Sequence, residues 1–200
     1  MPLDAYGLTP PSQRLQAAIK AIREADPRFD WDCPVYEWPS GFGSLVRVVS
    51  GQQLSTTAAG AIFKRLANQV GLTPEAILAA PDEALRGVGL SAAKTVCVRE
   101  LARAADTLEA LDGLDDEAAI QALSAIKGIG RWTAEVYLLF AHGRLDVLPA
   151  GDLGILVGYQ LMAGLERRPT DKELRAALTH LTPWRGVAGF LLWERYRRRT

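Results

Sequence analysis

Apolar residues recur along most of the chain at intervals of three and four positions, which is the spacing of one face of an α-helix. The first run follows Ser12, whose hydroxyl can cap a helix, and brings Leu15, Ala18, Ile19 and Ile22 onto one face. No stretch alternates apolar and polar residues for long enough to form a strand. The pattern therefore predicts an all-α protein with roughly ten helices.

The limits of the later helices follow from capping residues, glycines and prolines. Ser55 and Thr73 are suitable N-caps, Gly71 is a suitable stop, and Pro81 opens a further helix. Residues 33–43 hold two prolines and two glycines and are expected to form a loop. The helices expected after the first lie within 44–70, with a break before Ser55, then at 73–80, from Pro81, and at 91–108, 115–126, 131–142, 152–164, 171–181 and 183–199.

Composition narrows the class of protein. The chain has 200 residues, of which 48% are hydrophobic, so it can build a sizeable core without covalent cross-links. Its two cysteines, Cys33 and Cys97, are far apart and lack CxxC spacing, which excludes a cysteine-built zinc site or iron–sulfur cluster and favours two buried thiols. No secretion signal and no membrane-spanning apolar run is expected, and the expected location is the cytoplasm.

The formal net charge is zero, which argues against a binder of polyanions driven by overall charge but not against a local basic face. The chain ends on such a cluster, RYRRRT, at residues 195–200. Two interpretations stay open for this cluster: a solvated helix end, where cations are favoured, or contact with phosphate.

The stretch IKGIGRWTAEVY, residues 126–137, joins two expected helices through a loop with a glycine on either side of one apolar residue. An echo of it, LRGVGLSAAK, occurs at residues 85–94. One glycine per joint would serve as a helix C-cap, whereas a second glycine two positions later suggests that another backbone approaches the turn closely.

The helix that begins at Arg131 offers unpaired N–H groups and the positive end of its dipole to an anion. Lys127 and Arg131 lie beside this helix start. A glycine-rich turn, a helix N-terminus and two cations together indicate contact with a nucleic-acid phosphate, which would not depend on the base sequence.

These features make the chain resemble the helix-hairpin-helix DNA glycosylases over about Gly43 to Val157. The hairpin is IKGIGRWTA; the family's Gly/Pro loop and aspartate appear as LPAGD, Leu148 to Asp152; and its earlier motif appears as VVSGQQLS, Val48 to Ser55. All three motifs stand in the family order. The likeness is greatest to the alkylated-base branch, DNA-3-methyladenine glycosylase II.

The resemblance implies one all-α domain over residues 1–200, with two helical lobes and with the hairpin and the catalytic aspartate between them. A six-helix lobe would cover about 43–142, and the second lobe would combine about 1–42 with 143–200. The β-rich N-terminal domain of some members has no room, because the helical pattern starts near Ser12.

Asp152 matches the family's catalytic aspartate, and its carboxylate could stabilise positive charge on the sugar and orient the attacking water. An aspartate at a helix start is also an ordinary N-cap. Members that cut the DNA strand carry a lysine where this chain has Trp132, and indole has no amine for a covalent intermediate. The resemblance therefore implies a monofunctional hydrolase in base excision repair.

The base pocket implied by the resemblance would receive the base after it leaves the duplex. Trp132 and Trp184 would face an alkylated base, since an electron-rich indole attracts a cationic ring, and Arg185 would approach them. The position of the branch's pocket tyrosine holds Val136, and Tyr137, one step round the helix, is the tyrosine expected at the pocket here.

The GQQLS loop, residues 51–55, lies between two expected helices and is the candidate wedge that fills the space left by the base. Gln53 and Leu54 are the expected inserted side chains, and Gln52 is either part of the wedge or a buried cap. The hairpin residues expected to contact DNA are Lys127, Gly128, Ile129, Gly130, Arg131 and Thr133.

The resemblance also implies one sodium or potassium ion at the hairpin, bound by the backbone carbonyls of Ser124, Ile126 and Ile129 and taking no part in the chemistry. No other cofactor is expected. The expected partner is damaged double-stranded DNA, and the expected state is a monomer. Two alternatives stay open: a non-catalytic DNA-binding module, and a glycosylase for an oxidised or mismatched base.

Overall fold

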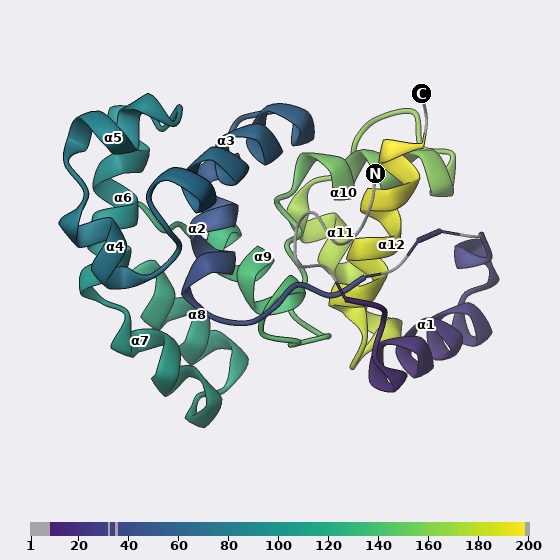
Figure 1. Ribbon diagram of the computed structural model, residues 1–200. Coiled ribbons are helices and arrows are strands. Elements are labelled where there is room, and N and C mark those ends of the chain that lie inside the picture. The colour runs from purple at the N-terminus through teal and green to yellow at the C-terminus, as the bar shows by residue number, and fades with distance from the viewer. Residues whose placement is uncertain (1–8, 32, 35, 199–200) are drawn as a thin grey trace. The chain divides into compact units, whose positions relative to one another are not determined.

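The computed structural model describes residues 9–31, 33–34 and 36–198 (Figure 1). In this part of the chain the structure is helical, and the strand-like pairing is limited to an isolated bridge between Thr9 and Glu37. The chain divides into two compact units. Trp38–Tyr137 forms the first unit, whereas residues 9–37 and 138–198 from both ends of the chain form the second.

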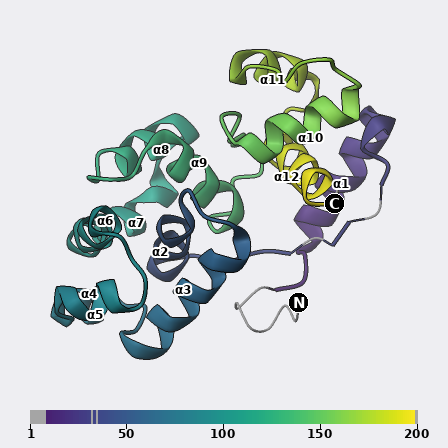
Figure 2. The same ribbon diagram turned by 90° about the horizontal axis from the view of Figure 1, so that it is seen from above.

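The first unit is a helical bundle. Its α2 packs against α3 and α6, and α6 packs in turn against α4 and α5 (Figure 2). The helices of this unit are α2 (Phe42–Gly51), α3 (Thr56–Gln69), α4 (Pro74–Ala79), α5 (Asp82–Gly87), α6 (Ala92–Arg103), α7 (Asp106–Glu109), the 3₁₀ turn η3 (Ala110–Gly113), α8 (Asp116–Ser124) and α9 (Arg131–Phe140), whose last turn lies past the unit boundary.

Polar caps start these helices as the sequence predicts. Ser55, Thr73, Ser91 and Asp115 each accept a hydrogen bond from a backbone N–H in the first turn of the following helix. The single helix expected over 91–108 is wrong: it breaks into α6 and α7. The N–H of the residue that ends α6 bonds to two successive carbonyls there, which tightens the backbone out of the α-helical path.

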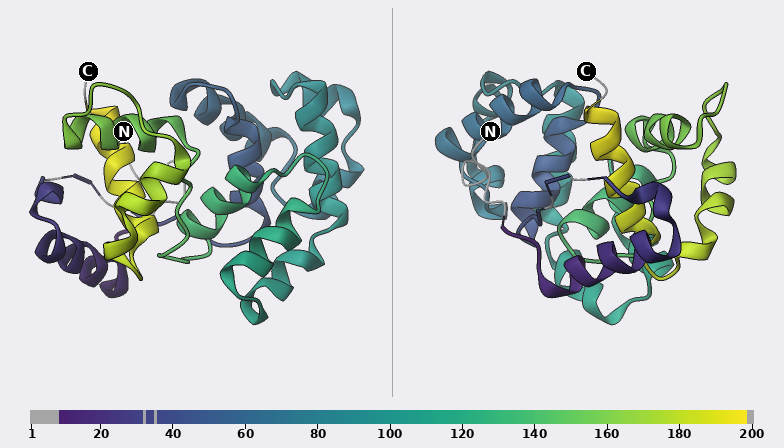
Figure 3. Two further views of the ribbon diagram at one scale, coloured as in Figure 1. Left: turned by 180° about the vertical axis from the view of Figure 1, so that it is seen from behind. Right: turned by 90° about the vertical axis from the view of Figure 1, so that its right-hand side faces the viewer.

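The second unit packs α12 (Arg185–Arg197) along α10 (Leu153–Ala163), as both views of Figure 3 show. Glycine makes this contact possible: a Cβ at Gly158 would lie 2.0 Å from the carbonyl oxygen of Leu192. The remaining elements of this unit are α1 (Gln13–Ala25), η2 (Pro27–Phe29), α11 (Asp171–Ala177) and η4 (Thr179–Leu181).

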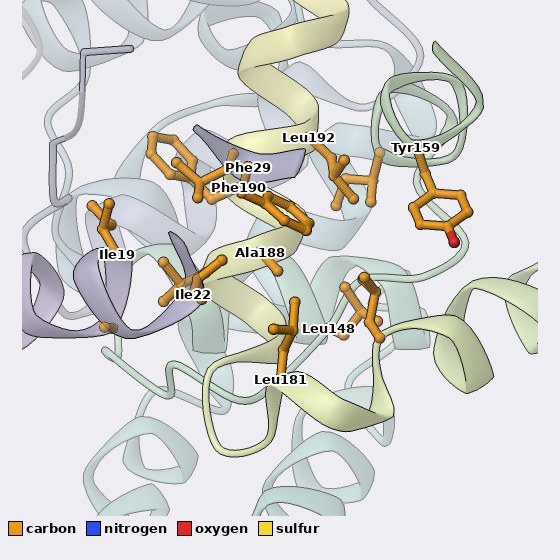
Figure 4. Packing of buried hydrophobic residues seen from close by; sticks show 14 of the residues in the cluster. Ile19, Ile22, Phe29, Leu148, Tyr159, Leu181, Ala188, Phe190 and Leu192 are labelled. Carbon is orange, nitrogen blue, oxygen red and sulfur yellow. The ribbon is translucent and has the colours of Figure 1, made fainter. Parts of the chain in front are cut away.

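The core of the second unit joins the two ends of the chain. Ile22 and Phe29 from its first part meet Leu148, Ala188 and other apolar side chains from its second (Figure 4). Burial of this apolar surface is what holds residues 9–37 against 138–198. No helix in the part of the chain that the structure describes is long and apolar enough to cross a membrane.

Candidate functional site

The conformation and packing of the hairpin between α8 and α9 depend on its first glycine, Gly128. Gly128 has φ +92°, which favours glycine, and a Cβ there would lie 2.7 Å from the Sγ of Cys97 on α6. Around Gly130, by contrast, a Cβ would meet nothing within 4 Å. The two glycines therefore differ: Gly128 is required by backbone conformation and packing, and Gly130 leaves the turn open to an approaching backbone.

Cys97 and Cys33 are both buried thiols without a disulfide, as predicted from their spacing. Burial raises the pKa of the Cys97 thiol to about 11, which disfavours the reactive thiolate, and the side chain of Cys97 packs against Gly128 of the hairpin.

The echo of the hairpin at residues 85–94 has a different geometry. Here the second glycine, Gly89, takes the left-handed conformation at φ +106°, and a Cβ on it would lie 3.0 Å from both Ile62 and Arg65. Arg65 also donates to the Val88 carbonyl across 2.9 Å. The two joints are thus alike in sequence but not in conformation: the open glycine is the first of the pair, Gly87, in the earlier joint and the second, Gly130, in the later one.

Arg131 is bound to its own unit. Its guanidinium donates two hydrogen bonds to the Glu117 carboxylate on α8, at 2.7 and 2.8 Å, and one to Glu135 on α9, at 3.0 Å. The hydrogen bonds that Arg131 donates to Glu117 are the main cause of its raised pKa. The prediction that the Arg131 guanidinium contacts phosphate is therefore corrected. Two carboxylates already neutralise its charge, and its hydrogen bonds link α8 to α9 across the hairpin.

The remaining hairpin residues offer one side-chain cation and a row of backbone groups. Lys127 is exposed and has no acidic partner within the described chain. Ile129 and Thr133 are only 4% and 2% exposed as whole residues, so the prediction that these two residues contact DNA is corrected: both are buried. The N–H groups of the first turn of α9 lack acceptors within the helix, which suits them to an anion.

The GQQLS loop is connected to the hairpin. The Gln52 side chain donates to the Thr133 hydroxyl across 2.9 Å, and Gln52 itself is half-buried at the C-cap position of α2. Gln53 has φ +58°, unusual for a residue with a side chain, and Leu54 is 43% exposed. The structure thus brings the base of the loop against α9 and leaves its tip exposed.

Asp152 lies at the start of α10 in the second unit. Its Oδ1 accepts the N–H of Ile155 across 3.1 Å, so the carboxylate caps the helix, and the side chain is half-buried. The preceding turn is closed by the Asp152 N–H, which donates to the Pro149 carbonyl. A carboxylate held in this way has a fixed orientation next to an exposed glycine, Gly151.

Of the predicted pocket residues, the two tryptophans keep accessible surface. Trp132 is half-buried in the first turn of α9, and Trp184 is half-buried at the start of α12. Tyr137 is corrected to a core residue, because it is 1% exposed and its hydroxyl accepts the Gly41 N–H. Arg185 is also reassigned: its guanidinium forms a two-point pair with Asp146, at 2.9 and 2.6 Å.

The predicted alkali-ion site lies on the turn after α8. The Ile126 carbonyl accepts the N–H of Ile129 at 3.0 Å, and a carbonyl oxygen has a second lone pair for a cation. The Ser124 hydroxyl is buried without a hydrogen-bond partner in the described structure. An ion or ordered water would satisfy such a group, so these residues fit the ion, and its presence stays a prediction.

Sequence reasoning missed Lys94, which lies in the first turn of α6. Its ammonium donates to the carbonyls of Ser50 and Gln52, at 2.9 and 2.8 Å. The available signal was the echo itself, because LRGVGLSAAK ends on this lysine. Its partners lie more than forty positions earlier, and no local pattern could have identified them.

The model of the HhH-GPD superfamily base excision DNA repair proteins matches residues 46–183, more than half of the chain. The chain therefore belongs to this family. DNA-3-methyladenine glycosylase 1 of Schizosaccharomyces pombe is 37% identical over 162 residues, which span 76% of this chain and 71% of that protein.

Two solved structures agree with this assignment. A 3-methyladenine DNA glycosylase of Schizosaccharomyces pombe in complex with abasic DNA has a TM-score of 0.76 and 31% identity, covering 90% of this chain and 95% of its own. A DNA-3-methyladenine glycosidase of Bacillus halodurans has a TM-score of 0.76 and 33% identity, covering 90% and 89%. Both are all-α proteins of the fold predicted from the sequence.

Proposed function

We propose that this protein is a monofunctional DNA glycosylase of base excision repair, which hydrolyses the N-glycosidic bond of alkylated bases flipped out of duplex DNA. The observation that carries the proposal is the fixed Asp152 carboxylate at the start of α10, in the LPAGD motif of a chain from a base excision repair family. The names of its relatives, 3-methyladenine glycosylases, point to the substrate class.

Hydrolysis of the N-glycosidic bond requires a carboxylate with a fixed orientation. Breaking the bond between base and sugar builds positive charge on the sugar, and a carboxylate that is already in place stabilises that charge without reorganising. The N–H of Ile155 holds one oxygen of Asp152. Asp152 would face the sugar and orient or deprotonate the attacking water.

Trp132 supports hydrolysis without strand cleavage. Strand-cutting relatives carry a lysine at the matching hairpin position, and here an indole stands in the first turn of α9. An indole cannot form the covalent imine through which those relatives act. This difference also counts against the alternative of a glycosylase for oxidised bases.

An alkylated purine is often cationic, and the faces of Trp132 and Trp184 would attract it once it is extracted. Binding to the duplex would rest on the α9 N-terminus, Lys127 and the open Gly130, which contact phosphate without reading sequence. The monomeric state and the cytoplasmic location stay predictions.

The decisive test is release of free base from duplexes that carry 3-methyladenine, 7-methylguanine, hypoxanthine or ethenoadenine. Wild-type protein should release at least one of the alkylated bases, and Asp152→Asn should release none at a comparable rate while still binding the duplex. Borohydride should trap no protein–DNA adduct. Duplex binding without base release by the wild type would favour a non-catalytic DNA-binding module instead.

A further inference from the structure

Two side chains from outside the loop hold the base of the GQQLS loop in place. Lys94, from the start of α6, donates to the carbonyls of Ser50 and Gln52. Thr133, from the first turn of α9, accepts a hydrogen bond from the Gln52 side chain. All of these residues belong to the first unit, so the arrangement is internal to one compact body.

The ammonium of Lys94 occupies the C-terminal end of α2. Helix carbonyls in the last turn have no partners within the helix, and a cation there both donates hydrogen bonds and opposes the negative end of the dipole. Burial lowers the pKa of Lys94, because desolvation disfavours the charged ammonium. Ser91 caps α6 through the Lys94 N–H and so fixes the backbone that presents the lysine.

Beyond these two tethers the loop is exposed. Gln53 takes its left-handed conformation directly after the bonded Gln52, and Leu54 follows with 43% of its surface exposed. Ser55 then starts α3 by accepting the Ala58 N–H. A rigid base below an exposed tip is what a side chain needs in order to enter a base stack, because a loose loop would yield instead of displacing the base.

We propose that Lys94 is a positioning residue for base extrusion: it clamps the end of α2 so that Gln53 and Leu54 can be driven into the duplex, and Thr133 provides the second tether. This inference rests on the proposed function, since it assigns a step of the same reaction. In this role Lys94 acts through the two carbonyls that it holds, not by contact with the base or the sugar.

The experiment follows extrusion directly. 2-Aminopurine next to the lesion gains fluorescence when the stack opens, and an Asp152→Asn background prevents hydrolysis during the measurement. Lys94→Met should slow the fluorescence rise about tenfold on a paired lesion, as expected for loss of charge-assisted hydrogen bonds. Lys172→Met, on the exposed face of α11, removes the same charge elsewhere and should leave the rise unchanged.

Two further measurements distinguish a positioning role of Lys94 from a general loss of folding or activity. A lesion opposite an abasic site has no base pair to break and is extruded more easily, so on it Lys94→Met should behave nearly as wild type. A second variant carries Gln53→Gly and Leu54→Ala at the loop tip. Adding Lys94→Met to it should slow the fluorescence rise little further, because both sets of changes disable the same insertion of the tip. Equal losses on paired and unpaired lesions, or losses that multiply in the combined variant, would overturn the proposal.

If Lys94→Met folds poorly, Thr133 gives an independent pair of variants. Thr133→Val removes the acceptor for Gln52 with little change of shape and should reproduce the slow rise on paired lesions, whereas Thr133→Ser keeps the hydroxyl and should not. A Thr133→Val protein with normal extrusion would also refute the tether. Wild-type protein that extrudes the base but never releases it would instead refute the proposed function alone.

Discussion

At the scale of single residues, Asp152 combines a structural and a chemical role. Its Oδ1 caps α10 by accepting the Ile155 N–H, and the same hydrogen bond fixes the direction of the carboxylate. The two interpretations of this aspartate are therefore not exclusive. Substitutions can separate them, because asparagine caps a helix about as well as aspartate but carries no charge.

We predict that Asp152→Asn keeps the melting temperature of the wild type while base release falls about 10²-fold or more, the cost of losing preorganised electrostatic stabilisation. Asp152→Ala should lose activity to a similar extent and also about 1 kcal/mol of stability, because its cap is gone. Thermal unfolding and single-turnover base release measure the two effects. Near-wild-type turnover of Asp152→Asn would leave the cap as the residue's one function.

A second residue-scale prediction concerns the tryptophans. Trp132→Leu and Trp184→Leu keep apolar bulk but remove the aromatic face, so release of cationic 3-methyladenine and 7-methylguanine should fall about tenfold. Release of neutral hypoxanthine should fall less. The comparison is made within one variant, so a general folding defect cancels. Equal losses for charged and neutral bases would mean that the rings only shape the pocket.

At the scale of elements, the hairpin glycines should differ in what they support. We predict that Gly128→Ala destabilises the protein by about 1–3 kcal/mol, since the new Cβ meets Cys97 in a left-handed conformation. Gly130→Ala should change stability by no more than about 0.5 kcal/mol yet weaken binding to damaged and undamaged duplexes alike. Denaturant unfolding and binding titrations test both. Normal duplex binding by Gly130→Ala would place the DNA elsewhere.

The two cationic residues of the hairpin, Lys127 and Arg131, should likewise differ in whether they support DNA binding or stability. Lys127→Met is expected to lower the salt dependence of duplex binding by about one unit of the logarithmic slope, with stability unchanged. Arg131→Gln should leave that slope unchanged and lower stability instead, since the buried Glu135 loses its ion pair with Arg131. Titrations at several salt concentrations decide between them. A smaller slope for Arg131→Gln would show that the guanidinium leaves its carboxylates when DNA binds.

At the scale of the whole molecule, one buried carboxylate should make stability depend on acid. The Asp26 side chain is 6% exposed, accepts two hydrogen bonds from the Arg28 guanidinium and lies 3.4 Å from His180. The Arg28 hydrogen bonds lower the pKa of Asp26, although its burial opposes them. A lowered pKa means that the contribution is present above the ordinary carboxyl pKa and is lost as pH falls through the folded-state value.

Asp26→Asn should therefore cost roughly 1–3 kcal/mol near neutral pH, and the deficit should shrink as the wild type is acidified. Melting temperatures of both proteins across the acid range measure it. Glu24→Gln is the matched control, because its pair with Lys20 is exposed and long, at 3.8 Å, and should contribute no more than about 1 kcal/mol. If the stability difference between Asp26→Asn and wild type stayed the same in acid, it would come from packing and not from the charge of Asp26.

Taken alone, the amino-acid sequence determined the features that depend on near neighbours and on ordered motifs. Helix starts at Ser12, Ser55 and Thr73 follow from capping chemistry within three residues, and the structure confirms them. The hairpin and the LPAGD loop identified the family through their order, which the match over residues 46–183 confirms. Such signals are readable because their cause lies within a few positions of the residue.

Only the tertiary structure decided how these residues are used. Gly128 is required because Cys97 packs against it, Arg131 is neutralised by Glu117, and Lys94 clamps a helix end more than forty residues earlier. Each depends on which elements meet in space, and burial of apolar surface sets that, not the local pattern. A residue's type states what chemistry it can perform, whereas its distant neighbours decide whether that chemistry faces the DNA or the core.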